Sequence, residues 1–363
     1  MVVGCGALGN EVLKNLALFG AEHIVVVDFD KVEIGNLSRS VLFSRQDAEQ
    51  LRRKVEVVAQ KLMEMNPDLN VVPLDADITN EVGLGWIRRM DVVLGCVDSR
   101  WARYCINRLC MRAGVPWIDG GISQLEGTVR VFAPGMNCYA CNLGSERLKE
   151  LRLRMPCSGM IRQQEAEGHA PTTPLITSII GAVEVQEALK IIHNKDVDTG
   201  NFTSLCGSMF YYEGQHLTTR ILKFKAYDED CDVHESWSPV IPVDISVQNS
   251  VREVLMKLKA RFNANQLSFM IPDECFVDFI VEKTTERSLK VMKPGRYVSE
   301  WIEKNKELCG SSYTNFYQHE YRVIGDDFPY QELSLEEMGI PVWTVFPVFA
   351  DEKEYYVEIE KEK

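Results

Sequence analysis

A glycine-rich turn opens the sequence. The run Gly4-Cys5-Gly6-Ala7-Leu8-Gly9 precedes a segment, 10–19, whose apolar residues recur at helical spacing. The next apolar run, 24–27, ends at Asp28-Phe29-Asp30, about twenty residues after the glycines. Glycines let a backbone approach phosphate oxygens at a helix N-terminus, and a carboxylate at this offset can accept hydrogen bonds from ribose hydroxyls. The pattern predicts a nucleotide site; a glycine turn that only packs a helix on a strand is the alternative. The residues that carry the prediction are Gly4, Gly6, Gly9, Asp28 and Asp30.

Two cations and one more carboxylate follow. Arg39 closes Asn36-Leu37-Ser38-Arg39, Lys54 opens an expected helix that runs to residue 65, and Asp98 ends the apolar run that starts at residue 92. Near the C-terminal edge of one sheet, cations suit the oxygens of a triphosphate and a carboxylate suits its magnesium. The set therefore favours ATP with Mg²⁺ over nicotinamide, because a hydride-transfer site has little use for these groups. Ordinary solvated surface charges are the alternative.

Two residue pairs have metal-ligand spacing. Cys138 and Cys141 form one pair, and Cys231 and His234 form the other, some ninety residues later in an acidic loop. Four such ligands are typical of a closed tetrahedral zinc site, whereas one pair alone could be a redox motif or chance. We interpret five further cysteines as core packing because they stand on apolar strand or helix positions: Cys5, Cys96, Cys105, Cys110 and Cys206.

The elements that position these residues predict an α/β fold. Strand, glycine turn and helix repeat through residues 1–236, which indicates a Rossmann-like, mostly parallel sheet. The pattern changes over 236–239, and 363 residues exceed what one core usually organises, so we expect a second domain at 240–363. Expected helices at 251–262 and 297–308, with strands at 275–281, 288–292 and 342–349, suggest a β-grasp-like α+β unit. A dimerisation or stability domain is the alternative for this part.

Composition narrows the functional classes. The formal net charge of −13 argues against a nucleic-acid-binding surface and leaves a basic protein partner open. No apolar run approaches the length of a bilayer span, and the sequence opens on a strand and glycine turn, so we expect no membrane association and a cytoplasmic location. The eleven cysteines suit reduced thiols and a metal site better than a disulfide framework.

The sequence resembles a known superfamily at these residues, the activating enzymes typified by the molybdopterin-synthase and thiamine-biosynthesis adenylyltransferases and by the activating subunits for ubiquitin-like modifiers. The resemblance covers roughly residues 1–235 in order. Its elements are the glycine turn, Asp28-Phe29-Asp30, Asn36 to Arg39, Lys54, the Asn66-Pro67-Asp68 helix end, Cys96-Val97-Asp98 and the late crossover helix around Gly181 to Leu189.

The resemblance implies a role for each matching residue. Asp28 would hold the ribose, Asn36, Arg39 and Lys54 the phosphates, and Asp98 the magnesium. A structural Zn²⁺ would be held by two cysteine pairs, with His234 standing here where the fourth cysteine is expected. Cys157, in an expected crossover loop, matches by position the cysteine that forms a thioester with the modifier, and the nearby Arg152, Arg154 and Arg162 favour its thiolate. An ordinary loop thiol is the alternative.

The resemblance also implies partners: a ubiquitin-like modifier, a conjugating enzyme recruited by the C-terminal domain, and a second subunit in a homodimer or heterodimer. Two rival functions stay open, an enzyme that stops at the adenylate and passes it to a sulfur donor, and a catalytically silent scaffold subunit. The first strand has only two residues before Gly4, where a strand normally has about five, and the relatives' N-terminal helical segment has no counterpart. We expect either a truncated start or another chain that supplies this part.

Overall fold

The computed structural model describes residues 1–152, 172–196, 203–225, 227–283, 285–309 and 316–360. The chain divides into two compact units. The first comprises Met1–Thr79, Ile87–Gly144 and Glu167–Ser236, and the second consists mainly of Trp237–Lys363.

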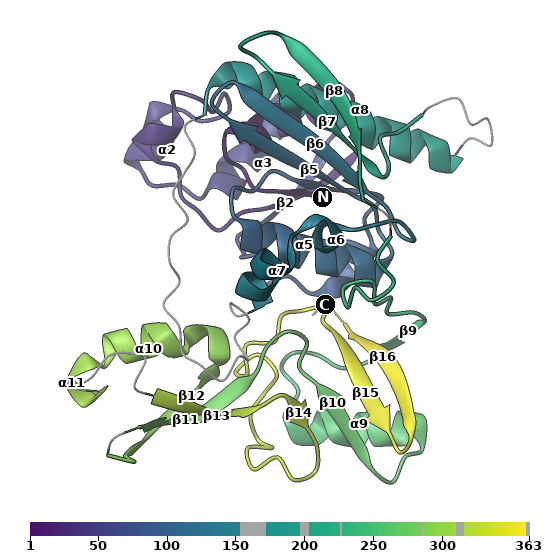
Figure 1. Ribbon diagram of the computed structural model, residues 1–363. Coiled ribbons are helices and arrows are strands. Elements are labelled where there is room, and N and C mark those ends of the chain that lie inside the picture. Colours follow the sequence, from purple (N-terminus) through teal and green to yellow (C-terminus); the bar gives the residue numbers. More distant parts are fainter. Residues whose placement is uncertain (153–171, 197–202, 226, 284, 310–315, 361–363) are drawn as a thin grey trace. The chain divides into compact units, whose positions relative to one another are not determined.

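An eight-stranded sheet forms the centre of the first unit (Figure 1). The strand order is β3-β2-β1-β4-β5-β6-β7-β8; the pairs from β3 through β5 are parallel, and those from β5 through β8 are antiparallel. The predicted mostly parallel α/β class is therefore confirmed. The strands are β1 (Val2–Val3), β2 (His23–Val27), β3 (Asn70–Leu74), β4 (Val93–Gly95), β5 (Trp117–Ser123), β6 (Glu126–Phe132), β7 (Ser208–Glu213) and β8 (Thr218–Lys223).

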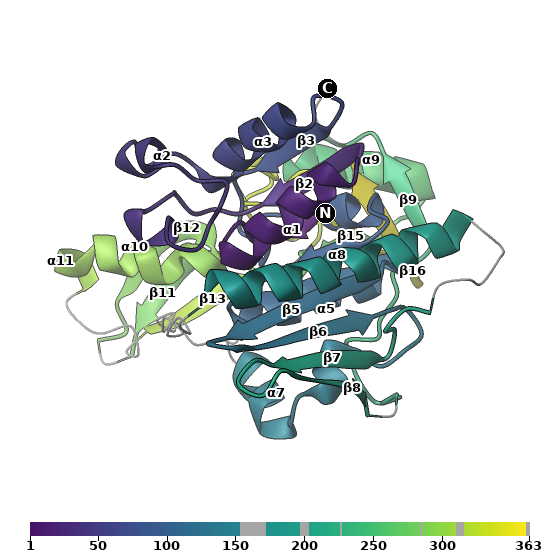
Figure 2. The same cartoon turned by 90° about the horizontal axis from the view of Figure 1, so that it is seen from above.

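Helices cover both faces of this sheet. Figures 1 and 2 show α1, α3 and α8 on one face and α5 on the other. Both faces of the parallel strands are thus buried, which is why β2 is a continuous apolar run rather than an alternating one. The helices are α1 (Ala7–Leu18), α2 (Arg45–Glu49), α3 (Lys54–Met65), α5 (Arg100–Ala113), α6 (Tyr139–Asn142) and α8 (Pro174–Asp196), and a short 3₁₀ helix, η1, spans Ile34–Asn36.

The strand order reverses between β1 and β4. From β1 the chain moves outward through β2 and β3, then returns to place β4 on the other side of β1. Val3 is therefore in register with both Val27 of β2 and Gly95 of β4. In open α/β sheets such a reversal leaves a crevice at the carboxyl ends of the strands, where ligands bind.

The second unit is α+β, as expected. A five-stranded sheet has the order β14-β10-β15-β16-β9. Strand β9, which comes first along the chain, runs parallel to β16, which comes last. Helix α9 begins at a capping box formed by Ser250 and Glu253. Strands β11 and β12 form a separate three-stranded sheet with β13. The strands are β9 (Val240–Val243), β10 (Leu267–Met270), β11 (Phe276–Glu282), β12 (Ser288–Pro294), β13 (Phe316–Tyr321), β14 (Val323–Ile324), β15 (Val345–Ala350) and β16 (Lys353–Ile359); the helices are α9 (Val251–Phe262), η2 (Gly295–Tyr297), α10 (Val298–Lys304) and α11 (Lys306–Cys309).

A segment from the N-terminal part of the chain, Asn80–Trp86, belongs to the second unit. The amide of Gly85 donates to the carbonyl of Trp343 at 2.8 Å, and the rings of Trp86 and Trp343 lie 4.4 Å apart. A Cβ at Gly83 would stand 2.3 Å from the carbonyl oxygen of Val342, so only glycine fits this approach. Two short helices adjoin the points where the chain passes between the units, α4 (Leu84–Arg88) and α7 (Ser145–Arg152).

Two boundaries in this unit differ from expectation. The helix predicted over 297–308 is two helices that meet at Asn305, so the prediction of one continuous helix was wrong. The strand predicted from residue 342 begins at Val345, because Trp343 takes a left-handed backbone conformation with a φ of 57°. Such a φ is unusual for a bulky side chain and interrupts an extended strand.

Candidate nucleotide site and metal centre

The glycine turn folds tightly against the end of β4. Gly4 has a φ of +96°, and a Cβ there would stand 2.6 Å from the carbonyl oxygen of Cys96. A Cβ at Gly9 would stand 1.9 Å from the carbonyl oxygen of Gly4. Packing within the chain therefore requires glycine at both positions.

Gly6 is different from these two glycines. It precedes the first residue of α1 in an ordinary extended conformation, and a Cβ there would meet nothing within 4 Å. The described part of the chain thus gives no steric reason for a glycine at position 6. Close approach of a ligand to the N-terminus of α1 would give one, and that is where phosphate oxygens bind.

Asn10 braces the same turn, a role that the motifs of the sequence do not indicate. It is fully buried, and its Nδ2 donates to the carbonyl oxygens of Cys5 at 2.8 Å and Gly6 at 3.0 Å. Its Oδ1 accepts from the amide of Leu42 at 2.9 Å. Asn10 therefore holds loop carbonyls toward the protein interior. The only signal in the sequence is an amide side chain among the apolar positions that open α1.

Asp28, Asp30 and Lys54 form one charged cluster at the carboxyl end of β2. Oδ2 of Asp28 accepts from the amide of Cys5 at 2.6 Å, and its Oδ1 accepts from the amide of Asp30 at 2.8 Å. Nζ of Lys54, the first residue of α3, lies 2.7 Å from Oδ2 of Asp30. The structure thus brings three of the predicted site residues together beside the glycine turn.

The protonation of this cluster follows from burial and charge. Burial raises the pKa of Asp28, although Lys54 and the Cys5 amide act in the opposite direction. Burial alone would lower the pKa of Lys54, but the carboxylates of Asp28 and Asp30 outweigh it and the pKa is raised. Lys54 therefore stays cationic at neutral pH, as a phosphate ligand must.

Asn36 and Arg39 lie on η1 and the turn after it. Oδ1 of Asn36 accepts from the amide of Glu33 at 2.9 Å, and Nη1 of Arg39 donates to the carbonyl oxygen of Gly35 at 2.9 Å. Among the described residues, neither side chain bonds to Asp28 or Lys54. These bonds use the Oδ1 of Asn36 and one nitrogen of Arg39, whereas phosphate oxygens accept from N–H groups, so the Nδ2 of Asn36 and the other N–H groups of Arg39 would be the phosphate donors.

Asp98 follows β4 by three residues, and its side chain is exposed. Because β4 pairs with β1, this residue and the glycine turn share the edge at which the strand order reverses. An exposed carboxylate there has the chemistry of a magnesium ligand beside a bound triphosphate.

The two metal-ligand pairs come together. Sγ of Cys138 lies 3.6 Å from Sγ of Cys141 and 3.9 Å from Sγ of Cys231, and Nε2 of His234 lies 3.2 Å from Sγ of Cys141. All four ligand atoms lie within 4.8 Å of one another. A tetrahedral zinc with bonds of about 2.3 Å to sulfur separates its sulfurs by roughly 3.8 Å, so the four residues fit the ion.

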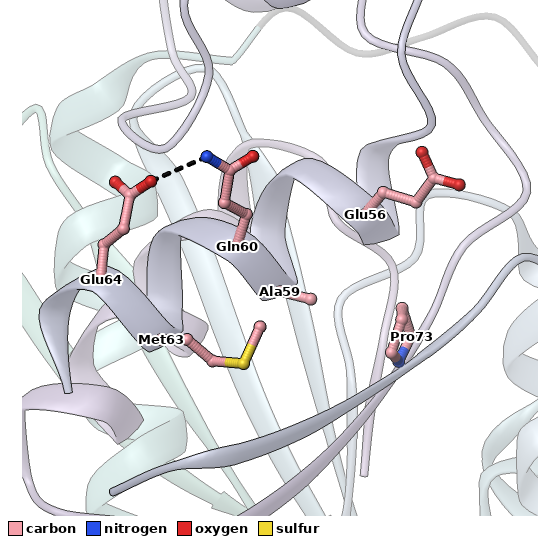
Figure 3. Close-up of a pocket in the computed structure, with 6 residues that line it drawn as sticks. All are labelled: Glu56, Ala59, Gln60, Met63, Glu64 and Pro73. Atoms are coloured by element: carbon pink, nitrogen blue, oxygen red, sulfur yellow. Dashed lines mark hydrogen bonds between the residues drawn. The ribbon is translucent and has the colours of Figure 1, made fainter. Parts of the chain in front are cut away.

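The nucleotide and metal sites described above include neither Cys157 nor the pocket near α3. Cys157 falls outside the described residues. A surface pocket lies between residues of α3 and β3, and none of the predicted nucleotide ligands lines it. Its residues are Glu56, Ala59, Gln60, Met63, Glu64 and Pro73 (Figure 3). This lining offers no cation for phosphate. None of the described helices combines the length and apolar character that crossing a membrane requires.

A protein-family model for the ThiF family matches residues 1–233. The chain belongs to the ThiF family. The match spans the first unit, with the glycine turn, the charged cluster, Asp98 and three of the four possible zinc ligands, and the resemblance inferred from the sequence is confirmed.

Several curated proteins are similar to this member of the ThiF family. The SUMO-activating enzyme subunit 2 of Dictyostelium discoideum is 34% identical over 39% of this chain and 21% of its own length. The adenylyltransferase and sulfurtransferase MOCS3 of Aedes aegypti is 30% identical over 64% of the chain and 49% of its own length. The SAMP-activating enzyme E1 of Haloferax volcanii is 28% identical over 64% of the chain and 78% of its own length.

The chain thus spans about half or less of the length of the first two of these relatives. Among solved structures, Escherichia coli MccB with ATP is similar over 64% of both chains, with a TM-score of 0.49 and 21% identity.

Proposed function

We propose that this chain uses ATP to adenylate the C-terminal carboxylate of a ubiquitin-like modifier in the cytoplasm. The open space at Gly6 is the observation that supports this most directly, because it leaves room for phosphates at the N-terminus of α1. The space lies at the reversal of strand order, beside Asp28 and Lys54. The printed names of relatives support the activating role, since they include activating enzymes for SUMO and SAMP and an adenylyltransferase.

In the proposed reaction a carboxylate oxygen of the modifier attacks the α-phosphorus of ATP. The bond from that phosphorus to the bridging oxygen breaks, pyrophosphate leaves, and an acyl-adenylate remains. Asp28 would hold the ribose, while Asn36, Arg39 and Lys54 would hold the phosphates. Mg²⁺, held by Asp98, would neutralise the charge that develops on the leaving pyrophosphate. Catalysis would consist mainly of positioning and charge neutralisation.

The second step we propose is capture of the acyl group by Cys157. Its thiolate would attack the acyl carbon, form a thioester and release AMP. The modifier would then pass to a conjugating enzyme recruited by residues 240–363, and the active species would be a homodimer or a heterodimer. A chain that stops at the adenylate is the competing function, favoured by the word sulfurtransferase in the name of one relative.

A structural Zn²⁺ completes the proposal. Cys138, Cys141, Cys231 and His234 would hold the ion in a closed site with no open position for substrate. Its role would be to tie α6 to the loop that follows β8.

Modifier-dependent exchange of labelled pyrophosphate into ATP tests the first step. The wild-type chain should catalyse the exchange and Asp98→Ala should lose it, because the variant lacks the magnesium ligand; undiminished exchange in Asp98→Ala would remove Asp98 from the mechanism. Cys157→Ala should keep the exchange but fail to form the modifier adduct that thiol reductant reverses. A wild-type chain that exchanges pyrophosphate without forming such an adduct would support the adenylate-only function.

A further inference from the structure

A buried ion cluster underlies the loop that carries Asp98. Nε of Arg103, on α5, lies 2.7 Å from Oδ1 of Asp119 on β5. Nη2 of Arg130, on β6, lies 2.8 Å from Oδ2 of the same carboxylate. Asp119 is fully buried, and the side chain of Arg103 is only 12% exposed. Each carboxylate oxygen therefore faces its own arginine, and two positive charges surround one negative charge.

Arg103 also bonds to the backbone after β4. Its Nη2 donates to the carbonyl oxygen of Val97 at 2.6 Å and to that of Gly120 at 3.1 Å, and its Nη1 reaches the carbonyl oxygen of Asp98 at 3.4 Å. One guanidinium thus joins α5, β5 and the loop 96–98. Ser99 adds to this order, because its Oγ accepts from the amides of Trp101 and Ala102 and fixes the start of α5 directly after the loop.

Arg130 shares the carboxylate but contacts a different part of the chain. Its guanidinium lies over the ring of Tyr139, 5.4 Å from the ring centre. Among the described residues, only Arg103 of the two arginines contacts the loop 96–98. The cluster therefore contains one arginine that could position Asp98 and one that serves as its matched control.

We propose that Arg103 is a positioning residue for the magnesium of bound ATP. Strand β4 has only three residues, so its ladder ends before the loop that carries Asp98. Beyond the end of the strand ladder, the guanidinium supplies hydrogen bonds to the loop. Its planar fork offers five donors in fixed directions and is always charged, so it can bind Asp119 and the Val97 carbonyl at once. The Asp98 carboxylate is thereby held at the carboxyl end of β4, beside the glycine turn. The inference rests on the proposed function, in which Asp98 binds the metal.

The alternative is that Arg103 only neutralises the buried charge of Asp119. A lysine would still neutralise that charge, but it could not reproduce the fork that reaches Val97 and Gly120. Arg103→Lys therefore separates the two roles, and Arg130→Lys makes the same chemical change at the other carboxylate oxygen.

The test is the effect of Mg²⁺ on ATP affinity, measured by calorimetry on the full chain with and without the metal. The dissociation constant for ATP without Mg²⁺, divided by that with Mg²⁺, reports the contribution of the metal site, and no modifier is needed to measure it. We expect the ratio to fall roughly tenfold or more in Arg103→Lys, the size typical of losing a group that orients a metal ligand. It should be unchanged in Arg130→Lys. In Asp98→Asn it should be close to one, and adding Arg103→Lys to Asp98→Asn should then lower it no further. Melting temperatures of all variants show whether each is folded, and Arg103→Gln repeats the comparison if the lysine variant is not folded.

An unchanged ratio in folded Arg103→Lys would overturn the inference while leaving the proposed function intact. An equal fall in Arg103→Lys and Arg130→Lys would also overturn it, because the integrity of the whole cluster, not the contact with the loop, would then control the metal. A wild-type chain whose ATP affinity does not respond to Mg²⁺ would instead refute the proposed function, and the inference with it.

Discussion

Positions 6 and 9 are both glycine, but for opposite reasons. Gly9 is required by the carbonyl of Gly4, 1.9 Å from its would-be Cβ, whereas none of the residues that the structure describes occupies the space beside Gly6. Serine is a good residue at the position before a helix, so Gly6→Ser should keep a melting temperature at or above that of the wild type. Its side chain would occupy the space proposed for phosphate, and we expect ATP affinity to fall about tenfold or more, about 1.4 kcal/mol.

Gly9→Ser makes the same chemical change where there is no room. It should lower the free energy of unfolding by at least about 2 kcal/mol, because backbone must move to admit the Cβ. Chemical denaturation and ATP titration of both variants check this pair. Wild-type ATP affinity in folded Gly6→Ser would show that no phosphate lies against this glycine.

Residues at recognisable offsets from the glycine turn could be predicted from the sequence, whereas residues that brace backbone carbonyl groups could not. Asp28, Asp30 and Lys54 stand at chemically meaningful offsets from the glycine turn, and the structure brings them together. Asn10 and Arg103 bind carbonyl groups, which every residue has, so no residue type marks their partners. The path of the backbone in three dimensions decides those contacts.

At the scale of elements, the possible zinc site joins two segments that have little regular secondary structure. Helix α6 has only four residues, and the loop with Cys231 and His234 belongs to no helix or strand. Zinc chelation should therefore lower the melting temperature, by about 5 °C or more. His234→Cys should keep one zinc per chain, because four sulfurs also make a tetrahedral site, while His234→Ala should lose it.

Elemental analysis and thermal melting check this prediction, and Cys206→Ser is the matched control. Cys206 is only partly buried and is not one of the four clustered ligands, so its replacement should leave the metal content unchanged. Equal zinc in His234→Ala and in the wild type would mean that histidine is not a ligand.

Element boundaries show where the sequence pattern was insufficient. The helix over 251–262 agrees with its prediction to the residue, because its amphipathic pattern and its capping box coincide. The break at Asn305 and the late start of β15 depend on backbone conformations of single residues, Asn305 and Trp343, that apolar periodicity does not encode. The pairing of β11 and β12 with β13 in a separate sheet is a long-range choice that local pattern leaves open.

At the scale of the whole molecule, the segment Asn80–Trp86 packs within the second unit although it comes early in the chain. A Cβ at Gly83 would lie 2.3 Å from the backbone of Val342, so Gly83→Ala should destabilise the second unit by about 2 kcal/mol or more. Gly144→Ala is the control, because a Cβ at that position would have none of the described residues within 4 Å and the change should be close to neutral. Hydrogen exchange of peptides from β15 and β16 should be faster in Gly83→Ala only. Equal protection in both variants would show that the segment is dispensable for this unit.

The position of this segment in the chain affects how the protein is made. Trp86 leaves the ribosome roughly 250 residues before Trp343, the ring it packs against. At about 5–20 residues per second, that interval is roughly 13–50 s. For this time a large aromatic side chain has no native partner from β15 or from the turn before it, although the residues that precede and follow it can already fold. A chaperone that binds exposed aromatic residues would therefore find its target early in synthesis, and the C-terminal unit could not complete its core until the last strands had emerged.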